Sequence, residues 1–376
     1  MSVLEVVFWL ASALIVYTHL GYPVVLWLLN RLRHRPSGRE APQAALPSVS
    51  LIIPAYDEEG VIAHKVADAL ALDYPRELLE VIVASDGSAD RTAEEARRAG
   101  ADLVLELEPG GKVAAQNAAA RRARGEILAF SDANAFWGPD AMRRLVARFA
   151  DPAVGYVCGQ VRFTNEAGDN LEGAYWRYEM AVRELESELA GVTGGNGAIY
   201  AVRRDAYIEL GPSGSHDLSF PFALAKRGMR AVYEPGARAE EKMVPTLEGE
   251  FARKRRMMVG LWDIVVGEGM LAPRGYAPLY ALEVASHRLL RYLTPALHAV
   301  LLGANLALLG EGWVYTAALI AQGALLGAAM AGRLFGALPF RVARYYVMTT
   351  ASIAAGLWDR LRGGPPGRWE RAGGTR

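Results

Sequence analysis

The chain has 376 residues, of which 52% are hydrophobic, and its 41 basic residues balance 41 acidic ones. This length predicts more than one structural unit. Without a net basic charge, no nucleic-acid partner is expected. The single cysteine, Cys158, excludes an internal disulfide and is expected to be a small buried hydrophobic side chain.

The excess of hydrophobic residues lies at the two ends of the chain. Residues 5–29 (EVVFWLASALIVYTHLGYPVVLWLL) exceed the roughly 20 residues that span a bilayer, and no small-residue cleavage site follows them. Four arginines come next: Arg31, Arg33, Arg35 and Arg39. By the positive-inside rule, they place the following segment in the cytosol. Residues 1–30 are therefore expected to form an N-terminal transmembrane helix.

The C-terminal third contains three more apolar segments: residues 289–309, 313–331 and 345–358. Three crossings here would leave the arginine-rich tail outside, against the charge rule, so one segment is expected to lie at the interface or to re-enter. For the last and shortest segment, an amphipathic surface helix is the alternative. The expected units are interface helices over 241–290, transmembrane or interfacial helices over 291–360, and a basic tail over 361–376.

The middle of the chain, residues 45–240, has the composition of a globular domain and follows a polar linker. Apolar runs typical of strands alternate with helical patterns such as residues 61–72 and 91–99. The strand-like runs are residues 48–54, 79–84, 101–107, 126–130 and 231–235. This alternation predicts an α/β domain with a Rossmann-like, mostly parallel sheet that is covered on both faces.

Acidic residues follow three of these strands. Asp57 and Glu58 follow the first, Asp86 follows the second, and Asp132 follows the fourth. In open α/β sheets the ligand lies outside the carboxyl ends of the strands. Asp86 with its glycine could also simply form a turn, as Asp90 could cap a helix. Acidic groups that converge repel one another unless a cation joins them, which indicates Mg²⁺ or Mn²⁺ on Asp132, with Asn134 beside it.

These segments resemble the family 2 glycosyltransferases with the GT-A fold, in particular their membrane-embedded branch, the cellulose and hyaluronan synthase-like superfamily. Residues 54–58 (PAYDE) resemble P-x-[YF]-N-E, residues 86–92 (DGSADRT) resemble D-[DG]-S-x-D-x-T, and residues 111–119 (GKVAAQNAA) resemble the glycine-lysine helix entry. Residues 132–134 (DAN) stand in place of the D-x-D metal motif. The resemblance implies donor contacts from Pro54, Tyr56, Glu58, Asp86, Lys112, Asp132, Arg253 and Arg256, with Asp132 and Asn134 as metal ligands.

The resemblance also implies an acceptor side. Residues 194–203 (GGNGAIYAVR) resemble the family's glycine-rich acceptor segment, and Asp217 stands in the position of the catalytic base. His216 replaces the acid that usually precedes this base. The implied acceptor residues are Gly195, Asn196, Gly197 and His216. A helix cap is the alternative for Asp217, and an ordinary loop side chain is the alternative for His216.

Residues 251–257 (FARKRRM) stand where the family has [QR]-x-x-R-W. Arg253 and Arg256 share a helix face and are suited to a departing diphosphate. Met257 replaces the tryptophan of many processive synthases, which favours a single transfer over polymerisation. The alternative is a basic helix on anionic lipid headgroups, with Lys254 or Arg255 facing the lipid.

Several other polar residues receive weaker assignments. Three glutamates of the helix-like stretch 172–189 are expected on a solvated face: Glu184, Glu186 and Glu188. Trp176 and Tyr178 are expected in the core, with an acceptor groove as the alternative. His19 and His298 lie in apolar segments, where polar groups are functional candidates, although a hydrogen-bonded structural role is an equal alternative.

The resemblance implies an inverting hexosyl- or N-acetylhexosaminyltransferase that uses a nucleotide-diphosphate sugar, with a UDP-sugar expected. The acceptor is a lipid or a growing polysaccharide at the cytosolic face of the plasma or inner membrane, and a homo-oligomer is an open possibility. A catalytically silent nucleotide-sugar-binding scaffold is the alternative. A dinucleotide-dependent oxidoreductase is excluded, because no G-x-G-x-x-G follows the first strand.

Overall fold

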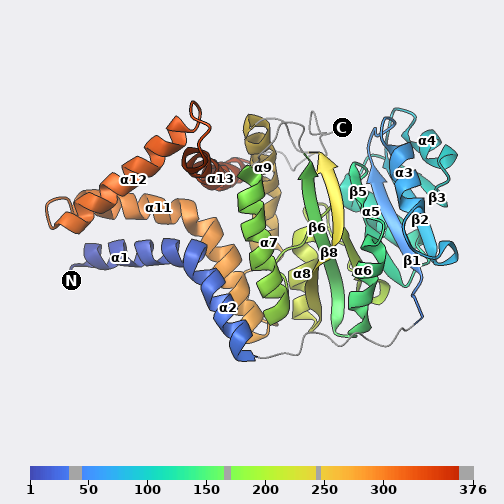
Figure 1. Cartoon of the computed structure of the whole chain (residues 1–376), viewed down its shortest axis with the longest axis horizontal. Coiled ribbons are helices and arrows are strands. Elements are labelled where there is room, and N and C mark those ends of the chain that lie inside the picture. The colour runs from blue at the N-terminus through green and yellow to red at the C-terminus, as the bar shows by residue number, and fades with distance from the viewer. Residues whose placement is uncertain (34–44, 165–170, 243–246, 364–376) are drawn as a thin grey trace.

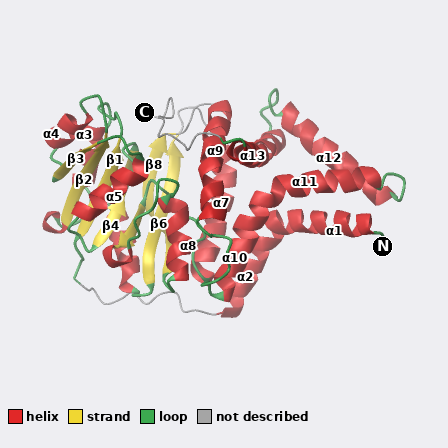
Figure 2. Ribbon diagram, turned by 180° about the vertical axis from the view of Figure 1, so that it is seen from behind, coloured by secondary structure: helices red, strands yellow, loops and turns green. Residues whose placement is uncertain are grey.

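The computed structural model describes residues 1–33, 45–164, 171–242 and 247–363 of the chain. Figure 1 shows an α/β part on one side and a set of helices that extends away from it on the other, with the N-terminus at the far end of these helices. Figure 2 shows the same division from behind. The hydrophobic ends of the sequence therefore gather in one place.

One eight-stranded sheet organises the α/β part, in the order β3-β2-β1-β4-β7-β6-β8-β5. Its strands are β1 (Val49–Ala55), β2 (Leu79–Asp86), β3 (Leu103–Leu107), β4 (Ile127–Phe130), β5 (Ala135–Trp137), β6 (Val154–Thr164), β7 (Tyr200–Arg203) and β8 (Arg230–Lys242). β1 to β4 pair in parallel, as predicted. Beyond β4 the sheet is mixed: β7 runs antiparallel to β4 and β6, β8 pairs in parallel with β6, and β5 runs antiparallel to β8.

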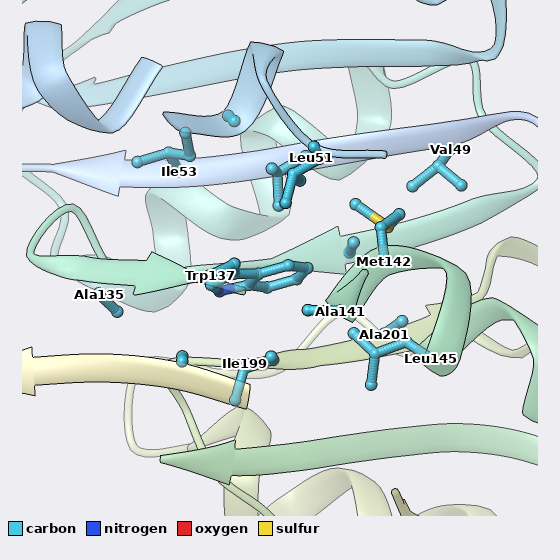
Figure 3. Close-up of a cluster of buried hydrophobic side chains, with 14 of the residues drawn as sticks. Val49, Leu51, Ile53, Ala135, Trp137, Ala141, Met142, Leu145, Ile199 and Ala201 are labelled. Carbon is cyan, nitrogen blue, oxygen red and sulfur yellow. The ribbon is translucent and has the colours of Figure 1, made fainter. Parts of the chain in front are cut away.

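Helices cover both faces of this sheet (Figures 1 and 2). They are α3 (Ile62–Leu70), α4 (Thr92–Arg98), α5 (Lys112–Arg122), α6 (Ala141–Ala147), α7 (Leu171–Leu189) and α8 (His216–Lys226). Successive side chains of β1 enter opposite cores: Leu51 and Ile53 lie in one apolar cluster, and Ile52 lies in the other. Figure 3 shows the first cluster, where Trp137 and Met142 lie near β1. Each such fully buried side chain contributes about 1.5–3 kcal/mol.

The N-terminal helical run is longer than predicted and is bent. It consists of α1 (Val3–Val16), the π-helical turn η1 (Tyr17–Gly21) and α2 (Tyr22–Arg33). α1 lies beside α11 (Leu290–Ala307), and α12 (Trp313–Ala331) turns back from the end of α11 and diverges from it at an angle (Figure 1). By length and composition, two helical runs are able to cross a membrane, Val3–Arg33 and Trp313–Ala331. Phe8 of α1 and Leu301 of α11 share an apolar cluster that joins the three helices.

The predicted segment 345–358 lies inside a longer helix, α13 (Leu338–Leu361), which packs against α9 (Leu247–Trp262). Arg255 Nε lies 2.6 Å from Asp359, and Lys254 Nζ donates to the Tyr345 hydroxyl. Both side chains contact α13, and the expectation that Lys254 or Arg255 faces lipid stays a prediction. Large apolar residues of α13 are exposed: Leu338, Val342, Trp358 and Leu361. This amphipathic character favours the surface-helix alternative for the segment.

Short helical segments join the two parts of the chain: η5 (Asp263–Gly267), α10 (Pro278–Glu283) and η6 (Val284–Leu289). Their apolar side chains, such as Val265 and Val284, form one cluster with Leu218 and Phe222 of α8. The interface segment therefore packs directly on the helix that carries Asp217. β8 reaches Lys242, so the sheet extends slightly past the expected boundary at residue 240.

Candidate active site

Four of the predicted site residues meet at the carboxyl end of the parallel strands. Lys112 is the first residue of α5, and its ammonium group forms an ion pair with Asp132 in the turn after β4. Burial would lower the pKa of Lys112, but Asp132 chiefly, with Asp217 and Glu241, raises it above its ordinary value. A Cβ atom at Gly197 would lie 4.0 Å from Lys112 Nζ. One cation therefore stands among three carboxylates beside the glycine-rich segment.

Asp86 holds the backbone that presents Lys112. Its two carboxylate oxygens accept hydrogen bonds from the N–H groups of Gly110 and Gly111, each 2.8 Å long. Gly111 has φ +88°, a left-handed conformation that favours glycine immediately before α5. Asp86 is buried and fixes the entry of the helix, while its predicted contact with the donor base stays a prediction.

The first two strand-end loops bind each other. The backbone N–H groups of Asp57 and Glu58 donate to the Ser88 and Thr92 hydroxyls, at 3.0 and 2.7 Å. Asp90 accepts from the N–H groups of Thr92 and Glu59, at 3.0 and 3.1 Å, whereas Arg91 occupies the cap position of α4. Asp90 therefore joins the two loops and is not the helix cap. The motif of residues 54–58 and the motif of residues 86–92 therefore form one rim, and the donor contacts of Pro54, Tyr56 and Glu58 stay predictions.

A fully buried lysine, Lys65, which was not predicted from the sequence, fixes the chain directly after the metal motif of residues 132–134. Lys65 of α3 donates to the Ala135 carbonyl at 2.5 Å and lies 3.3 Å from the Asp68 carboxylate. Asp68 in turn accepts from the Trp137 N–H at 3.2 Å. Burial lowers the pKa of Lys65 to about 8. The only sequence signal was a lysine among the buried apolar positions of α3, and the pair fixes β5 directly after residues 132–134.

The donor set at this turn fits a hard divalent cation. Asp132 offers carboxylate oxygens that already bind a positive charge, and Asn134 offers an amide whose nitrogen lies 3.4 Å from Glu241. In the described part of the chain, no three His, Cys, Asp or Glu side chains form a preassembled metal cluster. Mg²⁺ commonly needs only one or two carboxylates when substrate phosphates and water complete its shell, and such a set is present here.

The glycine-rich segment lies against Asp217, but one of its members has a structural role. The Gly195 N–H donates to the Asp217 carbonyl at 2.6 Å, and a Cβ atom at Gly195 would collide with the Tyr156 hydroxyl. Asn196 is buried; its amide nitrogen donates to the Gly159 carbonyl, and its oxygen accepts from Arg183 at 2.8 Å. The predicted acceptor contact of Asn196 is corrected to a positioning role, because both ends of its amide are used internally.

Asp217 lies in the first turn of α8, and Ser215 occupies the cap position. The cap alternative for Asp217 is therefore wrong: its carboxylate instead accepts a hydrogen bond from the Ser215 hydroxyl. The side chain is partly exposed and lies close enough to Lys112 to raise the pKa of that ammonium. These features agree with a carboxylate that meets a substrate.

His216 is a buried residue at the start of α8, so the loop alternative is wrong. Its Nε2 has no hydrogen-bond partner among the described residues, and the predicted acceptor contact stays a prediction. The His216 Nδ1 lies 2.6 Å from the Tyr200 hydroxyl, and the Phe130 and Phe220 rings meet the imidazole edge-on. Burial, with a smaller effect of Lys112, lowers its pKa to about 3. The imidazole is therefore neutral at physiological pH and packs among the buried aromatic side chains next to Asp217.

Replacing His216 with phenylalanine should flatten the acid dependence of stability. A folded-state pKa of about 3, below the ordinary 6.5, means that neutral His216 stabilises the fold above pH 6.5. This contribution is lost as the pH falls from 6.5 towards 3. Unfolding midpoints of the detergent-solubilised protein, measured across this range, should fall more steeply for wild type than for His216→Phe. Parallel slopes would contradict the assignment.

The remaining predicted residues occupy varied positions. Arg253 and Arg256 lie on α9, but their side chains are outside the described residues. Trp176 donates to the Val161 carbonyl at 2.8 Å and packs against the core, as expected. His298 lies 2.7 Å from the Tyr346 hydroxyl, which also lies 3.4 Å from His19, so the hydrogen-bonded alternative for the two histidines is supported.

A buried ionic network lies between α7 and the start of α11. Glu186 was expected on a solvated face, but it is buried and lies 2.7 Å from His287 Nδ1. It also accepts from the Tyr22 hydroxyl of α2 at 2.6 Å. Glu179 pairs with Arg291 at 2.6 Å. The expectation for Glu186 fails because helical periodicity does not reveal which second helix covers a face.

Comparisons with known proteins find similar sequences over the α/β part of the chain. Residues 50–211 match the family model described as Glycosyl transferase family 2. Glycosyltransferase AglE of Haloferax volcanii is 30% identical over 182 residues, which cover 47% of this chain and 59% of that protein. A beta-monoglucosyldiacylglycerol synthase of Trichormus variabilis is 28% identical over 281 residues, which cover 67% of this chain and 58% of that protein. The chain thus spans less than two thirds of these relatives.

A solved structure extends the similarity to nearly the whole chain. The mannosyltransferase PcManGT of Pyrobaculum calidifontis, solved in complex with GDP-Man and Mn²⁺, superposes with a TM-score of 0.74 at 26% sequence identity. The match covers 96% of this chain and 100% of that chain. Residues 50–211 therefore match a family 2 glycosyltransferase domain, and the mixed, mostly parallel sheet is of the GT-A type, as predicted.

Proposed function

We propose that the protein is an inverting glycosyltransferase that moves one sugar from a nucleotide-diphosphate sugar to a lipid acceptor at the cytosolic face of a membrane. The observation that carries this proposal is Lys112 among Asp132, Asp217 and Glu241 at the carboxyl edge of the sheet. This arrangement supplies a cation and carboxylates at one point, as transfer from a diphosphate to a hydroxyl group requires.

In this proposal each group has a separate task. Asp217 accepts the proton of the acceptor hydroxyl while the hydroxyl oxygen attacks the anomeric carbon of the donor sugar. The bond between the anomeric carbon and the diphosphate oxygen breaks on the opposite side, and the nucleoside diphosphate leaves. Lys112 binds the diphosphate, and Arg253 and Arg256 stabilise the charge that develops on it. Asp132 and Asn134 hold a divalent cation, which neutralises phosphate charge when it is bound. A single displacement inverts the anomeric centre.

The donor nucleotide has two candidates. The motif resemblance favours a UDP-sugar, whereas the mannosyltransferase that superposes on nearly the whole chain was solved with GDP-Man. Sugar and base specificity depend on the shape of the pocket, which the shared motifs do not encode. GDP-mannose therefore joins the UDP-sugars as a donor to be tested.

Membrane attachment and a lipid acceptor are supported by the helices and by one relative. Val3–Arg33 and Trp313–Ala331 are able to cross a bilayer by length and composition, and α11 packs between them. If α1, α11 and α12 cross while α13 lies at the interface, the arginine-rich C-terminus stays on the cytosolic side, as the charge rule favours. The Trichormus relative is named for glycolipid synthesis. A processive synthase of the cellulose and hyaluronan type is the less favoured form, since Met257 replaces the tryptophan.

The test is release of UDP or GDP by detergent-purified protein over a panel of nucleotide sugars, with Mn²⁺ or Mg²⁺ and a lipid extract. Metal-dependent release from one donor, with a glycosylated lipid as product, is expected. Sizing the product separates a glycolipid from a polymer. Nucleotide-sugar binding without release from any donor would instead favour the silent scaffold.

A further inference from the structure

Three hydrogen-bond donors gather on the membrane side of the acceptor segment. Arg288 lies in η6, Tyr292 in the first turn of α11, and Trp262 at the end of α9. Arg288 and Tyr292 are four residues apart and therefore share a helix face. The Tyr292 and Trp262 ring centroids are 5.9 Å apart with an interplanar angle of 59°. Three helical elements thus bring their polar atoms into one region.

Two of these donors have no acceptor in the part of the chain that the structure describes. The Tyr292 hydroxyl and the Trp262 indole nitrogen are buried, and neither has a hydrogen-bond partner among the described residues. Tyr292 is only 5% exposed. The indole N–H donates only, and buried polar groups are nearly always hydrogen-bonded. Two adjacent unpartnered groups indicate that an acceptor oxygen from outside the chain completes the site.

Arg288 adds a positive charge beside them. Its Nε donates to the Thr193 hydroxyl at 3.0 Å, and its guanidinium lies so close to Gly194 that a Cβ atom there would collide with it. No carboxylate lies within ion-pair distance of Arg288 in the described ranges, whereas Arg291, on the next turn, is paired with Glu179. Burial acts to lower the pKa of Arg288, but Tyr292 and Glu186 raise it, so the guanidinium stays charged.

These three side chains, the Arg288–Tyr292–Trp262 cluster, adjoin the proposed base. Arg288 contacts Gly194, and the next residue, Gly195, donates to the Asp217 carbonyl at 2.6 Å. Leu218, the neighbour of Asp217, shares an apolar cluster with Tyr292, and Trp262 packs against that cluster. From Tyr292, α11 continues into the apolar bundle with α1 (Figure 1). The Arg288–Tyr292–Trp262 cluster therefore lies between the proposed base and the helices proposed to enter the membrane.

We infer that the Arg288–Tyr292–Trp262 cluster binds a phosphate group carried by the lipid acceptor and so places the reacting hydroxyl beside Asp217. Arg288 supplies the charge, and the Tyr292 and Trp262 donors supply hydrogen bonds to phosphate oxygens. The donor diphosphate has a separate cation, Lys112, next to Gly197. The inference deepens the proposed function and rests on it for the identity of the acceptor.

Binding of a matched lipid pair tests the inference without turnover. Phosphatidic acid and diacylglycerol with the same acyl chains differ only in the phosphate. In detergent micelles, we expect phosphatidic acid to bind wild type at least about tenfold more tightly than diacylglycerol or inorganic phosphate does. Arg288→Gln and Tyr292→Phe should each weaken phosphatidic acid binding by about tenfold or more, because each removes a hydrogen bond to a charged group.

Two controls separate binding from folding. Tyr276→Phe removes a hydroxyl that already donates to the Met270 carbonyl at 2.8 Å, and it should leave phosphatidic acid binding unchanged. Tyr292→Phe removes an unpartnered hydroxyl, so the ligand-free variant should melt no lower than wild type even though it binds less lipid. A purely structural role for Tyr292 predicts the reverse.

Three outcomes would overturn the inference. These are equal binding of phosphatidic acid and diacylglycerol, inorganic phosphate that binds as tightly as phosphatidic acid, and unchanged binding in Arg288→Gln and Tyr292→Phe. Nucleotide-sugar affinity, measured on the same proteins, distinguishes the two failures. Loss of phosphate selectivity with donor binding intact rejects only the phosphate site at the cluster, whereas a wild type that binds no nucleotide sugar rejects the proposed function.

Discussion

Replacing Asp217 with asparagine is expected to lower the turnover number by about 10²- to 10⁴-fold while nucleotide-sugar affinity stays close to that of wild type. The amide has the size of the carboxylate but does not accept the proton of an acceptor hydroxyl, and general bases contribute about this factor. Asp217 also lies in the field of Lys112, whose main partner is Asp132, so the donor side of the site keeps its ion pair. Nucleotide release and equilibrium donor binding measure the two effects separately.

The matched control is Asp205→Asn. Asp205 is an exposed aspartate in the short helix Arg204–Ala206, and its substitution should leave both quantities unchanged. Ser215→Ala removes the hydroxyl that donates to the Asp217 carboxylate and should have an intermediate effect on turnover. Full turnover in Asp217→Asn would exclude this residue as the base and would direct attention to Glu241, another carboxylate near Lys112.

The carboxyl edge of the sheet was predictable from sequence because strand periodicity and turn chemistry are local. Once β1, β2 and β4 are recognised, parallel pairing brings the residues after them to one edge. Asp132 and Lys112 meet there although 20 residues separate them in the chain. The antiparallel strands were harder to predict, since β5 has only three residues and β7 only four.

The residues that the sequence analysis misjudged are those whose environment comes from distant segments. His216 is neutral and buried because Tyr200 and Phe130 surround it. The side-chain amide of Asn196 accepts a hydrogen bond from Arg183 and donates one to the Gly159 carbonyl. A polar side chain that follows a glycine-rich segment has the same appearance in sequence whether it meets substrate or core. Only tertiary packing, which sets burial, separates the two cases.

Lys65 shows the same point from the other side. A single lysine within α3 gives no sign in the sequence that its ammonium group donates to the carbonyl of Ala135, the first residue of β5. A buried charge is stable only when it has partners. The partners of Lys65 are the Ala135 carbonyl, just after the turn that carries Asp132, and the Asp68 carboxylate on its own helix. The precision of the metal motif thus depends on a residue outside every motif.

The second large effect is expected when either partner of the Lys112–Asp132 ion pair is substituted, because the two substitutions should shift the Mn²⁺ requirement in opposite directions. Asp132→Asn should lower kcat/KM by about 10³-fold or more and raise the Mn²⁺ concentration required for half-maximal activity, because it removes the only charged ligand among the two proposed ones. Lys112→Met should raise the KM for the donor yet lower the Mn²⁺ requirement by about tenfold. The reason is that the ammonium competes with the metal for the Asp132 carboxylate, and a like charge this close opposes cation binding.

Mn²⁺ titrations at fixed donor concentration, followed by donor titrations at saturating Mn²⁺, resolve these two effects. If Asp132 served only as the ion-pair partner of Lys112, the two variants would lose the same interaction and their Mn²⁺ requirements would move together. Opposite shifts therefore identify Asp132 as the metal ligand and Lys112 as a separate diphosphate contact. Equal shifts in one direction would assign the pair to fold stability and move the metal site elsewhere along the carboxyl edge, where Glu241 lies beside Asn134.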